Sequence, residues 1–207
     1  MNAEFLARLA QAQTEAEKDG LLTELSLSLL SPELRAMALA AAVPHWFDAD
    51  ILAALQPELA EQAQTLYREL QELSFVEVFP EKGHNLHERT RQAILKQLWD
   101  TDREAYRQFS QRLVDYFAED EVYRVEQIYH GVVADFEAGS REFERHIRHL
   151  DHNFRRGEAE ALLAAMQAQV EAQRVPDTFA ADVAYWFGQI HFRFYEAQEA
   201  LDRYDTA

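Results

Sequence analysis

Hydrophobic residues recur at spacings of three and four along most of the chain, which is the period of an amphipathic helix. In the N-terminal half this spacing predicts helices over residues 2–18, 21–30, 32–43, 57–73 and 88–99, with a further short helix that begins after Asp48. Gly20 is expected to end the first of them, since glycine is a common helix stop signal. Two helix starts carry capping residues, Ser31 before Pro32 and Asp48 before the short helix that follows it.

One stretch departs from the helical period. Residues 74–79 (SFVEVF) are β-branched and aromatic, and the turn residues Glu81, Lys82 and Gly83 follow them. A second short extended piece at 84–86 can return beside the first, so we predict a β-hairpin. Three helices, a hairpin and a further helix over residues 32–99 is the order of elements in a winged-helix domain.

Beyond residue 102 only helices are predicted, with breaks at Gly139, at Gly157 and before Pro176. Four residues recur at an offset of 34, the period of tetratricopeptide repeats: Arg107, Phe109, Leu113 and Tyr116 map to Arg141, Phe143, Ile147 and Leu150. We therefore expect a mainly α protein with an N-terminal helix (1–20), a winged-helix domain (21–100) and an antiparallel, tetratricopeptide-like array (101–207). A plain helical bundle is the alternative for the last part.

The amino-acid composition excludes several kinds of functional site. The 207 residues are 48% hydrophobic, enough for a packed core, and contain no cysteine. Disulfides, thiolate zinc sites and cysteine nucleophiles are therefore excluded. No apolar run approaches the about 18 residues that a membrane span needs. The N-terminus is too polar for a secretory signal, so we expect a cytoplasmic protein without a membrane partner.

Charge disfavours nucleic acid as a partner. The chain carries a net charge of −17, whereas polyanions bind through Lys and Arg. In the helix that would enter a DNA groove, residues 57–73, the single Arg68 stands against four acidic residues: Glu58, Glu61, Glu69 and Glu72. The electrostatic footprint of a DNA-binding protein is missing from this segment.

Enzymatic motifs are also missing from the sequence. There is no GxSxG, and the HERTR stretch at 87–91 does not match HExxH, so no enzyme is expected. His146, His149 and His152 recur every three residues beside Asp151, a set that metal ions can use. Steps of three drift around a helix and arginines surround them, so no metal site is expected.

A basic island covers residues 141–156, with five Arg against three acids. We interpret it as a solvated face that pairs with acidic neighbours or binds an acidic partner. Its candidate partner-binding residues are Arg141, Arg145, Arg148, His149, Arg155 and Arg156. The aromatic segment 185–195 is expected to be core; any aromatics exposed there would form a protein-binding patch or the seam to a further repeat.

Three segments resemble the winged-helix region of STAND-class signal-transduction NTPases, which include NB-ARC proteins and large ATP-dependent bacterial regulators: SPELRAMALAAAVPHWFDADILAAL, AEQAQTLYRELQELSFVEV and NLHERTRQAILKQL. A fourth, QIYHGVVADFEAGSREFERHI, resembles the start of the helical array that follows this region. The resemblance covers residues 21–155. It implies a non-enzymatic region that couples the state of a nucleotide-binding domain to binding of a protein partner. The alternatives are a DNA-binding transcription regulator and a stand-alone helical scaffold.

In NB-ARC relatives a Met-His-Asp motif opens the last winged-helix helix, and its histidine contacts the β-phosphate of ADP. Leu86-His87-Glu88 occupies that place, so the resemblance implies that His87 senses nucleotide phosphate, with Leu and Glu departing from the motif. No GxxxxGK[ST] loop occurs, so ADP or ATP is implied only where a nucleotide-binding domain accompanies this chain. The other interpretation of His87 is a helix-start histidine bonded to a nearby carbonyl or carboxylate.

Overall fold

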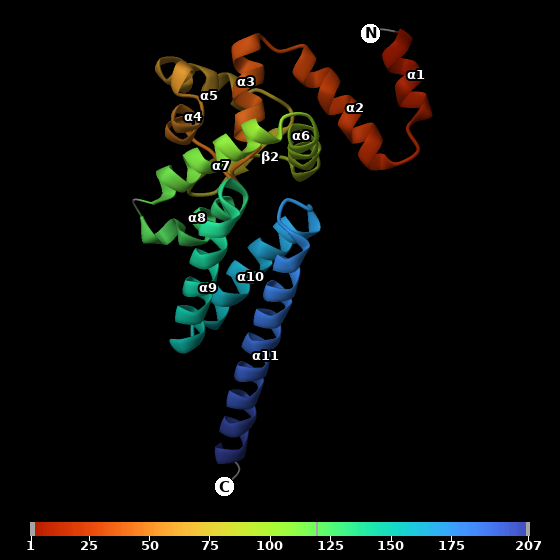
Figure 1. Ribbon diagram of the computed structural model, residues 1–207. Helices are drawn as coiled ribbons and strands as arrows, with labels where there is room; N and C mark the ends of the chain where they lie inside the picture. Colours follow the sequence, from red (N-terminus) through yellow and green to blue (C-terminus); the bar gives the residue numbers. More distant parts are fainter. Residues whose placement is uncertain (1–2, 119, 206–207) are drawn as a thin grey trace. The chain divides into compact units, whose positions relative to one another are not determined.

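The computed structural model describes residues 3–118 and 120–205. Within these ranges 78% of the chain is helical and one small two-stranded antiparallel sheet is present, which confirms the prediction of a mainly α protein (Figure 1). None of the helices described is long and apolar enough to cross a lipid bilayer. The chain divides into two compact units, Met1–Tyr116 and Phe117–Ala207.

The first unit contains the predicted sequence of three helices, a hairpin and a helix. Its elements are α1 (Ala3–Gln11), α2 (Glu15–Ser28), α3 (Pro32–Ala41), α4 (Ala49–Leu55), the 3-10 helix η1 (Pro57–Gln62), α5 (Ala63–Gln71), β1 (Val76–Phe79), β2 (Gly83–Leu86), α6 (Glu88–Thr101) and α7 (Arg103–Phe117), which ends at the boundary between the units. The helix predicted over 57–73 therefore opens with a 3-10 turn.

Side-chain caps set several of these boundaries. Ser31 accepts a hydrogen bond from the Leu34 amide at 3.2 Å, and Asp48 accepts one from the Ile51 amide at 2.8 Å, as predicted. Gly20 does not end a helix, because α2 runs through it. The break lies earlier, where Thr14 and Glu17 form a reciprocal capping box. Such a cap offsets the modest helix cost of one glycine.

The hairpin pairs Val76 with Leu86 and Phe79 with Gly83. A third segment joins it: the Phe47 amide donates to the His84 carbonyl at 2.7 Å, and the His84 amide donates to the Phe47 carbonyl at 3.0 Å. Gly83 has φ +112°, and a Cβ there would lie 2.5 Å from the Phe47 carbonyl oxygen. Glycine is therefore required where the chain turns under this bridge.

The core of the first unit lies between α3, α4, α5 and α6. Its fully buried side chains include Met37, Phe47, Leu52, Leu70 and Ile94. A buried arginine joins this core: Arg91 donates from Nη2 to the Val43 carbonyl at 3.2 Å and from Nε to the Pro44 carbonyl at 3.3 Å. These bonds satisfy carbonyls that follow the end of α3, and they fix α6 against that end.

The second unit is built from η2 (Glu121–Tyr123), α8 (Arg124–Ala134), α9 (Phe136–His152), α10 (Arg156–Glu171) and α11 (Asp177–Asp205). In Figure 1, α9 and α11 run opposite to α10. α8 packs on α9, and α10 packs on α8, α9 and α11. Short loops between helices of this length produce antiparallel neighbours.

Two predicted breaks are wrong in position. Gly139 lies inside α9 and is buried; the chain breaks before it at Asp135, which caps α9 by accepting from the Ala138 amide at 3.0 Å. A Cβ on Gly139 would lie 2.4 Å from the Gly131 backbone, so this glycine allows α8 and α9 to cross closely. Gly157 lies in the first turn of α10, and the chain breaks just before that helix.

The aromatic segment near the C-terminus is core on one side only. Trp186 and Ile190 are buried, whereas Tyr185, Phe187 and Phe192 are exposed. The side chain of Tyr195 lies outside the described residues. The prediction of core thus holds for part of the segment, and the other aromatic side chains are exposed.

Candidate functional sites

His87 stands at the corner where the hairpin meets α6. It occupies the N-cap position of α6, and its backbone amide donates to the Phe75 carbonyl at 2.8 Å. Its side chain makes no capping hydrogen bond. The backbone is therefore held by the hairpin, while the imidazole projects beside the first turn of the helix.

A carboxylate of the hairpin contacts this imidazole. His87 Nδ1 lies 3.2 Å from Glu77 Oε2, and the two side chains are 52% and 46% exposed. Asn85 Nδ2 donates to the other Glu77 oxygen at 3.1 Å, which orients the carboxylate. This contact matches the interpretation of a helix-start histidine bonded to a carboxylate. About half of the ring side chain stays open to solvent and to any further ligand.

The charge at this corner is mixed. Glu88, in the first turn of α6, accepts from Gln92 Nε2 at 2.6 Å and complements the helix dipole. Glu77 is the carboxylate that contacts the His87 imidazole. A phosphate group would be attracted here only by the protonated form of His87 and by the amides of the helix end, and it would have to displace Glu77.

A second histidine of the hairpin has a structural role that the sequence did not indicate. The Tyr67 hydroxyl lies 2.7 Å from His84 Nδ1, with the two rings edge-on at 5.4 Å. Burial raises the pKa of the Tyr67 phenol, so it stays protonated at neutral pH and can donate this bond. The contact ties β2 to α5. Tyr67 fits the helical apolar spacing, and that spacing alone gives no sign of a polar partner.

The basic patch predicted over 141–156 lies on α9 and the start of α10. Each of its arginines pairs with a carboxylate three or four residues away: Arg141 with Glu137, Arg145 with Glu142, Arg148 with Glu144, Arg155 with Glu158 and Arg156 with Glu160. Exposed pairs of this kind contribute under about 1 kcal/mol each. These arginines can therefore exchange their own carboxylates for carboxylates of a partner protein at a small cost in free energy.

Two of the three histidines of α9 lie side by side. His146 and His149 stack with ring centroids 6.2 Å apart, and His149 also lies beside Asn153. Burial lowers the pKa of His146, and the charges of Arg124 and His149 lower it further. In the described ranges no group of three or more His, Asp or Glu side chains could hold a metal ion.

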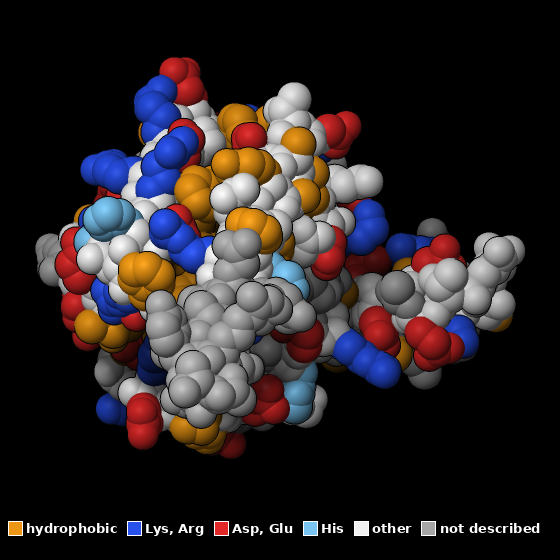
Figure 2. Space-filling model, turned by 90° about the horizontal axis from the view of Figure 1, so that it is seen from below, with side chains coloured by type: hydrophobic (Ala, Val, Ile, Leu, Met, Phe, Trp, Pro, Cys, Tyr) orange, Lys and Arg blue, Asp and Glu red, His pale blue; other side chains and the backbone are white. Residues whose placement is uncertain are grey.

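Two of the predicted patch residues, Arg141 and Arg148, share a cleft of about 360 Å³ between α9 and α11. The Arg148 guanidinium lies 5.5 Å from the Trp186 ring centre. Glu144 and Asp182 also line the cleft, so its charges of opposite sign balance. On the face shown in Figure 2, basic and acidic side chains are likewise interspersed, with hydrophobic side chains between them.

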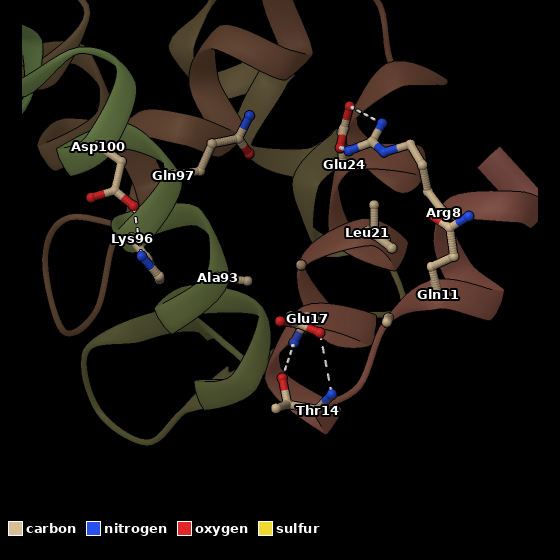
Figure 3. Close-up of a pocket in the computed structure, with 12 residues that line it drawn as sticks. Arg8, Gln11, Thr14, Glu17, Leu21, Glu24, Ala93, Lys96, Gln97 and Asp100 are labelled. Carbon is tan, nitrogen blue, oxygen red and sulfur yellow. Dashed lines mark hydrogen bonds and ion pairs between the residues drawn. The ribbon is translucent and has the colours of Figure 1, made fainter. Parts of the chain in front are cut away.

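A wider groove of about 800 Å³ lies between α1, α2 and α6 (Figure 3). Leu21 and Ala93 make part of its apolar floor. Ion pairs border it, Arg8 with Glu24 at 2.9 Å and Lys96 with Asp100 at 2.6 Å. The groove depends on α2 folding across α6, a contact between residues far apart in sequence, so sequence patterns gave no signal for it.

Comparison with known proteins gives no match. No protein-family model fits the sequence, and neither curated proteins nor solved structures include a significantly similar one. What the protein does is therefore inferred from its own residues and their geometry.

Proposed function

We propose that this chain is a non-enzymatic regulatory and protein-interaction region of a signal-transducing, NTPase-type protein. In this proposal the first unit is a winged-helix domain. The order α3, α4, α5, β1, β2, α6 supports it, with Phe47 bridged to the hairpin as a third extended segment. The observation that carries the proposal is the place of His87, exposed beside the hairpin at the first turn of α6.

In the second unit the proposal assigns a tetratricopeptide-like array. The spacing of its helices supports it: α8 and α10 begin at Arg124 and Arg156, close to the 34-residue repeat period. α9, α10 and α11 also alternate in direction (Figure 1). An array of this kind presents a surface to a protein partner, and the basic patch on α9 and α10 is a candidate contact.

The proposed coupling is an exchange of partners at His87. The imidazole lies against Glu77 when no phosphate is near, and it transfers to the β-phosphate of ADP held by a nucleotide-binding domain of the same protein. Since the pair with Glu77 is half exposed, its loss costs little. Forming or breaking the phosphate contact would favour different rigid-body positions of the first unit, and so signal nucleotide state.

The test is the rate of ADP release from the protein that carries this chain together with a nucleotide-binding domain. His87→Ala should speed ADP release by about ten- to a hundredfold, because the loss of one hydrogen bond to a charged group weakens binding by about that factor. Glu77→Gln should slow release, because it removes the competing carboxylate. Release can be followed by stopped flow with a fluorescent ADP analogue.

His152→Ala is the matched control, since His152 is an exposed histidine at the end of α9 and far along the chain from the hairpin. It should release ADP like the parent protein. Release that is unchanged in His87→Ala would rule out the sensor role.

A further inference from the structure

Helix α11 carries apolar residues on two opposite sides. Phe179, Val183, Trp186 and Ile190 follow steps of four, three and four, and all are buried against the second unit. At about 100° per residue, residues 181, 185, 188 and 192 follow the same steps on the other side of the helix. An amphipathic helix normally presents polar residues on that side.

The outer face of α11 is defined by Ala181, Tyr185, Gly188 and Phe192, with the polar side chains of Asp182 and Gln189 along one edge. Tyr185 is 59% exposed and Phe192 is 60% exposed. Between them, a Cβ on Gly188 would meet nothing within 4 Å. Glycine destabilises a helix interior relative to alanine, and no packing among the described residues requires it at this position.

The second unit shows what such a glycine does when a helix lies on it. At Gly139 a Cβ would lie 2.4 Å from the α8 backbone, so the glycine is the notch that lets two helices cross closely. Gly188 presents the same kind of notch with an aromatic ring on each side. The shape of the outer face therefore fits a helix.

The charge around the outer face indicates which kind of partner helix would bind. From Asp177 to Phe192 the sequence has two aspartates, at 177 and 182, and no Lys or Arg. The nearest arginines already have carboxylate partners: Arg193 donates to Asp151 at 2.7 Å, and Arg148, which lines the cleft beside Tyr185 and lies over Trp186, pairs with Glu144. A second copy of the chain would bring the same aspartates and a further net charge of −17. A basic partner is complementary, and its cations could also lie over the exposed aromatic rings.

We propose that the outer face of α11 is a docking site for an amphipathic helix of a partner protein, with small residues at the crossing point and Lys or Arg on its flanks. The partner's small residue would enter the notch at Gly188, and its apolar stripe would cover Tyr185 and Phe192. The inference rests on the partner-binding half of the proposed function and is independent of the nucleotide half. It also differs from the basic patch, which suits acidic partners.

The probe is a synthetic helical peptide with leucines along one face, alanine at their centre and lysines on both flanks. We expect it to bind the full chain in isothermal titration calorimetry. A control peptide with glutamate in place of every lysine should bind at least about tenfold more weakly, because both binding partners are then acidic.

Gly188→Leu should weaken binding of the lysine peptide by at least about tenfold, because the side chain fills the notch. The helix itself should persist, since leucine is a better helix former than glycine. Gly157→Leu is the matched control: a Cβ there also meets nothing within 4 Å, in the first turn of α10. It should leave binding unchanged, and circular dichroism melts show that both variants are folded.

Failure to bind the lysine peptide, or equal binding of the glutamate peptide, would overturn the proposal. So would equal affinities of the two glycine variants. A dimer in sedimentation that Gly188→Leu dissolves would assign the face to a second copy instead. Unchanged ADP release in His87→Ala would remove the nucleotide-coupled function and leave these binding results standing.

Discussion

Two polar side chains of α6 and its N-cap show how differently neighbouring residues can be held. Arg91 is 5% exposed and directs its guanidinium to the Val43 and Pro44 carbonyls, so moving it would leave buried acceptors unsatisfied. His87 is half exposed and has one carboxylate, Glu77, beside its ring. Its contact can be exchanged at low cost. That difference, rather than the presence of a histidine, is the reason that we propose His87 as the switch residue.

His146 is expected to make the second unit sensitive to acid. Burial, Arg124 and His149 lower the pKa of this imidazole, so the unfolded chain takes up the proton at a higher pH than the folded unit does. Protonation therefore favours unfolding, and stability should fall as the pH drops below the unfolded value of about 6.5.

His146→Gln should reduce this fall, measured as the thermal midpoint by circular dichroism between about pH 7 and about pH 5. His152→Gln is the control, because His152 is exposed on the same helix. Identical pH dependence in both variants would show that another group is responsible.

Among the helices, boundaries follow caps more than glycines. α2 and α9 begin where Thr14 and Asp135 accept backbone hydrogen bonds, and Gly20 and Gly139 lie within these helices. A cap satisfies amides that would otherwise lack a partner, whereas one glycine costs only about 1 kcal/mol. Gly139 is required by the packing, because α8 passes too close for any side chain.

Gly139→Ala should destabilise the second unit by about 1–3 kcal/mol, since the added methyl meets backbone of α8 that cannot rotate away. Urea unfolding followed by circular dichroism measures this loss. Gly157→Ala is the matched control: its methyl enters open space, so stability should stay equal or rise slightly. Equal stability of the two variants would contradict the close crossing.

The chain as a whole is strongly acidic, and this limits its partners. Its net charge is −17, and the basic patch is already paired with carboxylates of its own helices. The potential around such a protein repels polyanions and attracts cationic surfaces. This excess of negative charge disfavours DNA as a partner. It also favours the basic partner helix that we propose for the outer face of α11.

We expect no binding of duplex DNA at low salt, measured by fluorescence anisotropy. A variant with lysine in place of Glu58, Glu61, Glu69 and Glu72 tests the reason, because it converts the charge of the segment 57–73. This variant should gain weak, salt-dependent binding. Salt-dependent binding by the parent chain would instead favour a DNA-binding regulator.

Much of the fold could be predicted from local patterns. The caps at Ser31 and Asp48, the hairpin and the start of α6 depend on residues that are close in sequence, and the structure has them where they were predicted. The position of His87 at the helix start follows from the same local rules. Helical spacing likewise placed most of the helices, with errors at their ends.

Local sequence patterns could not predict the features that join distant segments of the chain. The Phe47 bridge that requires Gly83, the notch role of Gly139 and the groove between α2 and α6 each need the position of a second element. Spacing along α11 shows two apolar faces, and only packing shows which one is buried. Backbone preference and capping act within a few residues, whereas burial and close approach are set by whichever distant surface lies opposite.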